Sequence, residues 1–303
     1  MPDDLAAAAG GPPALLAAVA PRAYRVTFED GSTVRYTDQV EVRPRYAYFR
    51  YPQGISEAGT PLSLMPEDDA AEVFRQAGLG PSAVRVLLAV SRMEGGFDSV
   101  NTYDTGCLSV GFLQFPAMED GRGSLAAVLT RMRKESPREH ERDFRAYGVD
   151  VDPAGALVVV DPASGAELHG ADAVRCCIED KRLVAVFQRA GRRDAFRRAQ
   201  VRAAVELYWP ADDAVRVTAG KRLLTGRVSD IVRSEAGLAT LLDRKVNRGS
   251  LEPFADVVRR VAEREGLSDL RAVAAWEREI VAALRFRADF LQDPSLSQPR
   301  AVR

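Results

Sequence analysis

Two carboxyl groups, Glu94 and Asp104, are the residues of this chain best suited to do chemistry. Glu94 follows the nearly all-apolar stretch 84–90, which is typical of a buried helix. Burial and the negative end of a helix both raise a carboxyl pKa, and a carboxyl group that stays protonated near neutral pH can act as a general acid. Asp104 lies instead in the polar turn Tyr-Asp-Thr-Gly, where backbone N–H donors keep a carboxylate ionised.

The residues after Asp104 extend this pattern. Ser109 could return beside Asp104 across a short hairpin and hold a water molecule, while Gly106 and Gly111 would let the backbone approach a sugar closely. Two carboxyl groups in opposite environments are what glycoside hydrolysis uses. Each feature alone has a simpler explanation, as a helix end or a common turn. Their order within 16 residues favours an active site.

Other polar side chains are candidates for sugar contacts. Asn101, Tyr103 and Gln114 flank the carboxyl groups, and amides bond hydroxyl groups while aromatic rings stack on sugar faces. Asp243 and Asn247 are four residues apart on a predicted helix, so they share one face, which either lines the far side of a cleft or is solvated.

Gln200 lies beside the apolar stripe of another predicted helix. It either bonds the backbone of the active-site hairpin or is a satisfied buried amide, and a structural role is the more favoured of the two.

The stretch 92–115 resembles the active-site segment of the lysozyme-like superfamily. Phage-type lysozymes have a Glu at the end of a helix, an Asp on a β-turn and a Thr on the next strand, followed by an apolar-Gly motif. Glu94, Asp104 and Ser109-Val110-Gly111-Phe112 stand at those places, with the Asp one residue later and Ser in place of Thr. The resemblance implies that Glu94 is the acid, that Asp104 is the base or charge stabiliser, and that the reaction inverts the anomeric centre. Inversion requires carboxyl groups about 6.5–9.5 Å apart, and retention about 5–5.5 Å.

Two related families leave alternatives open. Glu94-Gly95-Gly96-Phe97 and Gly111-Phe112-Leu113-Gln114 are similar to motifs of soluble lytic transglycosylases, which use one Glu and no second carboxylate. The segments 195–215 and 241–249 resemble bacterial chitosanases, so the likeness extends over about 81–290. A third alternative is a non-catalytic lysozyme-like part of a phage-tail-like or injection assembly. An ion-paired Glu94 with its cleft filled by residues 149–168 would favour that alternative.

Composition narrows the function classes. The 303 residues carry 42 basic and 43 acidic side chains, so no global field attracts nucleic acid or a membrane surface. Two histidines and three cysteines offer little for a metal site or a disulfide framework, and no nucleotide-binding motif is present. We expect no cofactor, no metal and no membrane span. The expected substrate is peptidoglycan or a related aminosugar polymer, with chitosan less favoured because a polycation calls for an acidic surface.

The pattern predicts an α+β protein, mainly α, with a lysozyme-like domain and a small β-hairpin subdomain. The expected divisions are a flexible tail at 1–21, a β module and linker at 22–66, the glycan-cleaving domain at 67–292 with a hairpin insertion at about 149–168, and a flexible tail at 293–303. Asp30-Gly31 predicts a hairpin turn in the β module, between the segments YRVTF and TVRYT. Helices are expected at 67–77, 81–93, 125–133, 171–179, 181–190, 192–208, 212–224, 227–248, 253–265 and 268–292.

The first residues do not read as an export signal. Asp3 and Asp4 stand where positive charge is expected, and glycines and prolines interrupt the apolar stretch. The sequence therefore favours a protein made in the cytoplasm that acts at the cell wall after lysis, or after delivery by an injection or phage-like system on which it docks.

Overall fold

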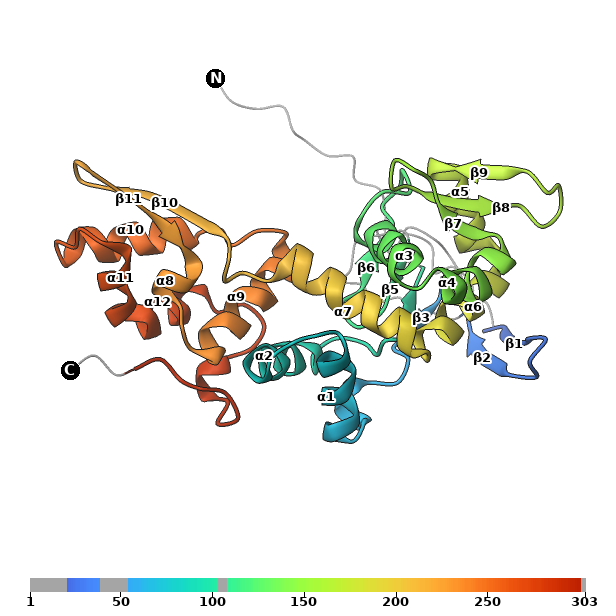
Figure 1. The fold of residues 1–303 in the computed structure, drawn as a ribbon, viewed down its shortest axis with the longest axis horizontal. Helices are drawn as coiled ribbons and strands as arrows, with labels where there is room; N and C mark the ends of the chain where they lie inside the picture. The colour runs from blue at the N-terminus through green and yellow to red at the C-terminus, as the bar shows by residue number, and fades with distance from the viewer. Residues whose placement is uncertain (1–20, 39–53, 103–107, 301–303) are drawn as a thin grey trace, which may run out of the picture.

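The structure is a computed structural model that describes residues 21–38, 54–102 and 108–300 (Figure 1). It is α+β, with about half of the residues in helices and small antiparallel sheets, which confirms the predicted class. No helix among the described residues is long and apolar enough to cross a bilayer.

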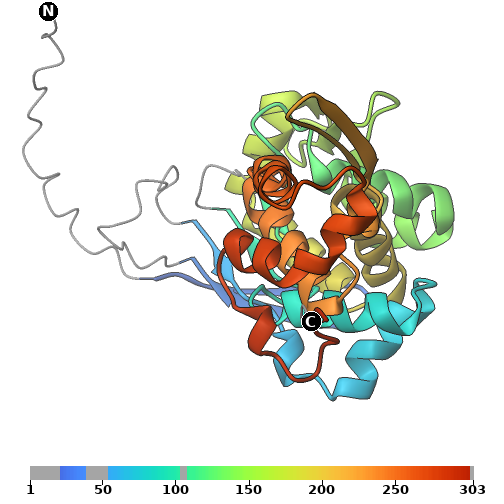
Figure 2. The ribbon, with the colours of Figure 1, turned by 90° about the vertical axis from the view of Figure 1, so that its left-hand side faces the viewer.

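Helices are the dominant elements. The α-helices are α1 Glu67–Gln76, α2 Pro81–Ser91, α3 Ser124–Glu135, α4 Pro137–Asp143, α5 Gly170–Glu179, α6 Lys181–Gly191, α7 Asp194–Tyr208, α8 Val228–Ile231, α9 Glu235–Arg248, α10 Phe254–Arg264, α11 Leu270–Val273 and α12 Glu277–Leu284. Short 3-10 helices are η1 Leu62–Leu64, η2 Arg145–Tyr147, η3 Ala274–Trp276 and η4 Phe290–Gln292. Helix α7 spans the middle of the molecule, and residues 214–300, which we call the C-terminal lobe, gather at one end (Figures 1 and 2).

The strands form four antiparallel sheets within the described ranges. They are β1 Ala23–Thr27, β2 Thr33–Thr37, β3 Ser56–Glu57, β4 Val100–Asn101, β5 Ser109–Val110, β6 Phe115–Pro116, β7 Val149–Val151, β8 Leu157–Val160, β9 Glu167–His169, β10 Ala214–Ala219 and β11 Arg222–Arg227. The sheet orders are β1-β2, β3-β4-β5-β6, β7-β8-β9 and β10-β11. Because β3 joins β4, the predicted linker contributes a strand to the sheet that follows Glu94.

Helix α2 leads the chain to Glu94. Its first residue is Pro81, whose fixed φ suits the start of a helix, and Gly80 precedes it in an extended conformation. Seven of its residues are buried, as the apolar pattern predicts, and it packs against α1 and α9. The one strongly polar interior position is Arg85, which pairs with Glu235 of α9 at 2.6 Å. Two buried helices therefore hold the end of α2 in place.

An aromatic cluster lies beneath the sheet that follows Glu94. The ring centroids of Phe97 and Phe112 are 4.9 Å apart, and Phe74 of α1 lies 5.9 Å from Phe97 and 5.7 Å from Phe112. All three side chains are almost completely buried. Burying large rings in offset and edge-on contact stabilises the hairpin from below.

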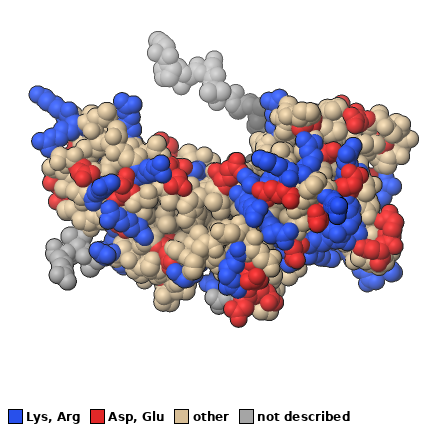
Figure 3. All heavy atoms as spheres, viewed as in Figure 1, with Lys and Arg blue, Asp and Glu red and all other residues tan. Residues whose placement is uncertain are grey.

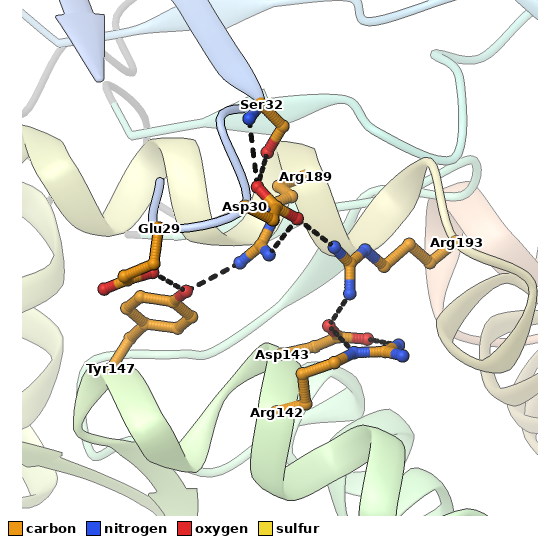
Figure 4. A network of polar contacts seen from close by, with 8 residues as sticks. All are labelled: Glu29, Asp30, Ser32, Arg142, Asp143, Tyr147, Arg189 and Arg193. Atoms are coloured by element: carbon orange, nitrogen blue, oxygen red, sulfur yellow. Dashed lines mark hydrogen bonds and ion pairs between the residues drawn. The ribbon is translucent and has the colours of Figure 1, made fainter. Parts of the chain in front are cut away.

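The predicted N-terminal hairpin is confirmed, and it is bound to the helices through its turn (Figure 4). Asp30 accepts bonds from Arg189 of α6 at 2.6 Å and from Arg193 at 2.9 Å. Arg189 is 8% exposed, lies 4.3 Å from the Phe28 ring centre and donates to the Tyr147 hydroxyl at 2.8 Å. A hairpin of this size is not stable alone, and this cluster supplies the surface on which it packs.

The helix predicted at 212–224 is wrong. Strands β10 and β11 form a hairpin there, and burial alternates along β10, with Val215, Val217 and Ala219 buried against α10. The segment Ala-Val-Arg-Val-Thr-Ala alternates with period two, and Gly220 adopts φ 59° at the turn. This periodicity is that of a strand with one buried face, which the prediction of a helix overlooked.

Several element boundaries also differ from the prediction. The predicted helix 227–248 is two helices, α8 and α9, and 268–292 is α11, η3, α12 and η4. Helix α4 was not predicted, and residues 149–168 contribute a third strand, β9, beyond the expected hairpin.

The segment 293–300, for which the sequence predicts a flexible tail, packs against α9. Leu296 is 4% exposed, and Ser297 bonds Glu235 through its backbone N–H and its hydroxyl, each at 3.0 Å. Apolar burial and a buried carboxylate partner fix this segment, which corrects the prediction for these residues.

Candidate active site

Glu94 lies three residues beyond the last residue of α2, and its backbone N–H donates to the Ser91 carbonyl at 3.0 Å. Its side chain is only 10% exposed. Burial raises the pKa of Glu94 above its ordinary value, and the nearby Asp243 carboxylate raises it further. The Arg287 guanidinium and the Asn247 amide lower this pKa, but burial has the larger effect. This carboxyl group therefore takes up a proton more readily than an exposed glutamate.

Arg287 is the main partner of Glu94. Its guanidinium donates from Nη2 to Glu94 and from Nε to Asp243 at 2.9 Å, and its backbone N–H donates to the second oxygen of Asp243 at 3.1 Å. Asp243 is 1% exposed. A guanidinium held at both its Nε and backbone N–H by a buried carboxylate is fixed in orientation, so it also fixes the Glu94 carboxyl group.

Helix α9 places Asp243 and Asn247 on the side of the site that faces Glu94. The Asn247 amide donates to the Asp243 backbone carbonyl at 2.8 Å and to its carboxylate at 3.1 Å. The one-turn spacing predicted from the sequence is thus realised, and Asn247 hydrogen-bonds toward Glu94. Of the two interpretations left open, the one that placed this face toward the site agrees with these contacts.

The hairpin formed by β4 and β5 carries two further predicted residues. Asn101 lies opposite Ser109 in the antiparallel register, and Val100 lies opposite Val110. Ser109 is 5% exposed, so little of it faces solvent. Tyr103 and Asp104 belong to the connection between these strands and lie outside the described residues.

Glycines let the segment after Glu94 pack closely. A side chain at Gly95 would overlap Ser99, and one at Gly96 would overlap the backbone of Thr60. Gly111, at φ 87°, lies against the Gln200 amide, which accepts from the Phe112 backbone N–H at 3.2 Å. Of the two glycines predicted to allow close approach to a sugar, Gly111 therefore contacts the protein itself, and Gly106 lies outside the described residues.

Gln200 joins both ends of this segment. Besides accepting from Phe112, its amide donates to the Phe97 carbonyl at 2.9 Å, and the residue is fully buried. It thus bonds the hairpin backbone and is a satisfied buried amide at once, so the two interpretations of Gln200 coincide.

Gln114, a predicted sugar contact, braces the hairpin. It adopts a left-handed backbone conformation with φ 52°, and its amide donates to the Ser99 hydroxyl at 2.5 Å and to the Gly111 carbonyl at 3.0 Å. Two local acceptors therefore already use its amide donor, which supports a positioning role.

The described residues thus bring Asn247 to Glu94, link Glu94 to Asp243 through Arg287, and place Asn101 opposite Ser109 in one hairpin. Arg287 was missed by sequence reasoning, because it lies 193 residues from Glu94 and follows no motif. Among the described residues no group of three or more His, Cys, Asp or Glu is placed to hold a metal ion.

Comparisons with protein-family models, with curated proteins and with solved structures found no match for this chain. We therefore argue function from the chemistry of the site.

Proposed function

We propose that this chain is a glycoside hydrolase of the lysozyme-like type that cleaves the glycan strand of peptidoglycan. The observation that carries the proposal is the environment of Glu94. Its carboxyl group is nearly buried at the end of a buried helix, and its pKa is raised by desolvation. A carboxyl group in this state is suited to donate a proton near neutral pH.

In the proposed reaction Glu94 gives its proton to the glycosidic oxygen as the bond from that oxygen to the anomeric carbon breaks. Asp104 takes a proton from a water molecule, whose oxygen bonds the anomeric carbon from the opposite face and inverts it. Ser109 helps to place this water. Asn101, Tyr103 and Asn247 contact the sugars. Gln114 supports these contacts chiefly by holding the hairpin in shape. The Glu94 carboxylate and the protonated Asp104 then exchange protons with solvent to restore the starting state.

Arg287 acts as a positioning residue in this scheme. It orients the Glu94 carboxyl group and stabilises the carboxylate that remains after proton transfer, because its guanidinium stays paired with Asp243.

The charge distribution on the molecule does not favour a polycationic substrate. Basic and acidic atoms are intermixed on the face shown in Figure 3, and the totals are 42 and 43. Chitosan is therefore a less favoured substrate than peptidoglycan. We further propose that the protein is made in the cytoplasm and reaches the wall after lysis, or docked on a phage-tail-like or secretion assembly.

One observation favours a second candidate, a non-catalytic lysozyme-like part of such an assembly. Glu94 is ion-paired with Arg287, as a structural carboxylate would be. The non-catalytic candidate would also require residues 149–168 to fill the cleft of Glu94, and this is not supported. Strands β7 and β8 pack against α3 and α5, and the partners of Glu94 come from residues 243–287.

Release of labelled fragments from purified peptidoglycan distinguishes the two candidates. We expect the Glu94→Gln variant to be at least about 100-fold slower than wild type, since general acid catalysis contributes about 10²–10⁴-fold. Glu179→Gln, an exposed glutamate at the end of α5, is the matched control and should retain full activity. Equal rates for folded Glu94→Gln and wild type, or no release by wild type, would contradict the hydrolase proposal.

A further inference from the structure

The C-terminal lobe contains a cavity of about 740 Å³ that the proposed reaction does not use. Its walls come from three places: the chain before α9, the α11 and η3 segment, and the end of the described chain at 297–300. A volume in this range suits a ligand of one or two sugar units.

This cavity is distinct from the Glu94 site. Ser234, which caps the start of α9, lines the cavity, whereas Asp243 on the same helix contacts Arg287. The two positions are nine residues apart in a helix, which corresponds to about 14 Å along its axis.

One wall of the cavity is apolar and includes an aromatic ring. Ala274, Ala275 and Trp276 form η3 and line the space, and Trp276 is only partly buried. An indole ring beside small side chains offers a flat surface to the apolar face of a sugar, with room for the ring to approach.

The other walls are cationic. Arg233, Arg271 and Arg300 line the cavity, and the carboxyl group among its lining residues belongs to Glu277. Glu277 is 5% exposed, and its carboxylate accepts from the backbone N–H groups of Arg233 at 3.0 Å and Ser234 at 2.8 Å.

Arg271 contacts Asp230 at 3.4 Å, and Arg300 makes no ion pair with any residue of the described part of the chain. Guanidinium groups with donors to spare bind carboxylates in bidentate geometry. The cavity therefore favours a ligand that carries negative charge.

Gln298 braces one wall of the cavity. Its amide nitrogen donates to the carbonyls of Phe290 at 3.2 Å, Asp293 at 2.8 Å and Leu296 at 3.2 Å, which fixes the side chain. Its oxygen is buried and has no hydrogen-bond partner among the described residues. Because this oxygen is not accessible from the cavity, Gln298 contributes to the site by holding the wall at 297–300 in place.

We propose that this cavity is a second glycan-binding site, specific for an oligosaccharide that bears a carboxylate. Trp276 stacks on a sugar ring, and Arg271 and Arg300 bind the carboxylate. The choice of ligand rests on the proposed function, because the glycan strand of peptidoglycan carries a lactyl group on alternate sugars, and this group is a free carboxylate wherever the stem peptide has been removed. The site would hold the strand while another part of it is cleaved.

Trp276 provides a direct readout, since the chain has only two tryptophans, Trp209 and Trp276. In a Glu94→Gln, Trp209→Phe protein, peptide-free peptidoglycan glycan strands should change the fluorescence saturably. Arg271→Gln with Arg300→Gln should weaken this binding at least tenfold. Arg278→Gln, an exposed arginine on α12 without an ion pair in the described structure, is the matched control and should not weaken it.

A second measurement covers the case in which Trp209→Phe does not fold. Glu94→Gln protein labelled with 5-fluorotryptophan gives two fluorine signals, and the one lost in Trp276→Phe identifies the reporter. The proposal is overturned if the Trp276 signal does not respond, if the double arginine variant binds as tightly as its parent, or if neutral chitooligosaccharides bind equally well.

The two proposals fail in different ways. Cleavage of peptidoglycan without a Trp276 response would overturn the second site alone, and a saturable Trp276 response in a protein without cleavage activity would overturn the hydrolase alone.

Discussion

Replacing Arg287 with glutamine tests how the Glu94 carboxyl group is held. The change removes the guanidinium that bridges Glu94 and Asp243, and it leaves the 1% exposed Asp243 with Asn247 and the backbone N–H of residue 287 as donors. Removing one partner of a buried pair costs about 3–5 kcal/mol. The Arg287 side chain is 30% exposed, so solvent reduces this to about 2–3 kcal/mol. For a chain of 303 residues we expect Tm to fall by roughly 3–5 °C.

Replacing Arg287 should also shift the pH dependence of the reaction rate in a defined direction. Arg287 lowers the pKa of Glu94, so its removal raises that pKa further. A charge-assisted hydrogen bond contributes about 1.5–3 kcal/mol, which corresponds to an upward shift of about 1–2 pKa units. A general acid works in its protonated form, so activity falls as pH rises through its pKa. The basic limb of the pH–rate profile should therefore move to higher pH by about 1–2 units, while the maximal rate falls because the carboxyl group is less well oriented.

The assay is fragment release from peptidoglycan across the pH range, together with thermal unfolding, for wild type, Arg287→Gln and the double variant with Asp243→Asn. The double variant should recover part of the lost Tm, because it removes the unpaired buried carboxylate, but not the lost rate. A basic limb that stays in place or moves to lower pH would refute the assignment of Arg287 as the positioning partner of Glu94.

Three further predictions concern the elements that support the site. Gly111→Ala should lower the free energy of unfolding, measured with denaturant, by about 3 kcal/mol or more, because φ is 87° and the new methyl group would overlap Gln200. Gly31→Ala is the comparison: φ is 77° there but the space is open, so the loss should be only about 1 kcal/mol. Gln200→Leu removes two buried hydrogen bonds to the Phe97 and Phe112 backbones and should cost about 2–4 kcal/mol, with loss of activity at temperatures where it stays folded; full activity and stability would contradict it. Asp30 has a strongly lowered pKa through Ser32 and Arg189, so its contribution to stability is present above the unfolded pKa and is lost as pH falls. The amide protection factors of β1 and β2, which compare observed with intrinsic exchange rates, should therefore fall in acid in wild type, and they should be low at all pH values in Asp30→Asn.

Local signals predicted much of the fold. The apolar stretch of α2, the Asp30-Gly31 turn, the start of α6 and the end of α7 depend on neighbours in sequence, and the structure confirms them. The hairpin at 214–227 was recoverable, because its alternation is present in the sequence. The packing of 293–300 could not be predicted from the sequence, because Leu296 and Ser297 contact partners that no local pattern specifies.

Some features of the candidate site could likewise be predicted from the sequence, and others could not. The pKa direction at Glu94 followed from its position at a helix end, and the spacing of Asp243 and Asn247 predicted only that they share one helix face. Arg287 and the brace formed by Gln114 did not, because each depends on a tertiary contact or a backbone conformation that the sequence does not display. Asp104 and Tyr103 lie outside the described residues, so their roles stay predictions.

The most direct test of the central claim is mass spectrometry of the fragments that the protein releases from purified peptidoglycan, with Glu94→Gln and Asp104→Asn alongside wild type. The hydrolase proposal predicts fragments that end in a reducing sugar, carry one added water and are lost in both variants. Anhydro ends, with Asp104→Asn nearly as active as wild type, would instead assign a lytic transglycosylase that acts through Glu94 alone. No fragments from wild type, with chitosan also uncleaved, would contradict an enzymatic role.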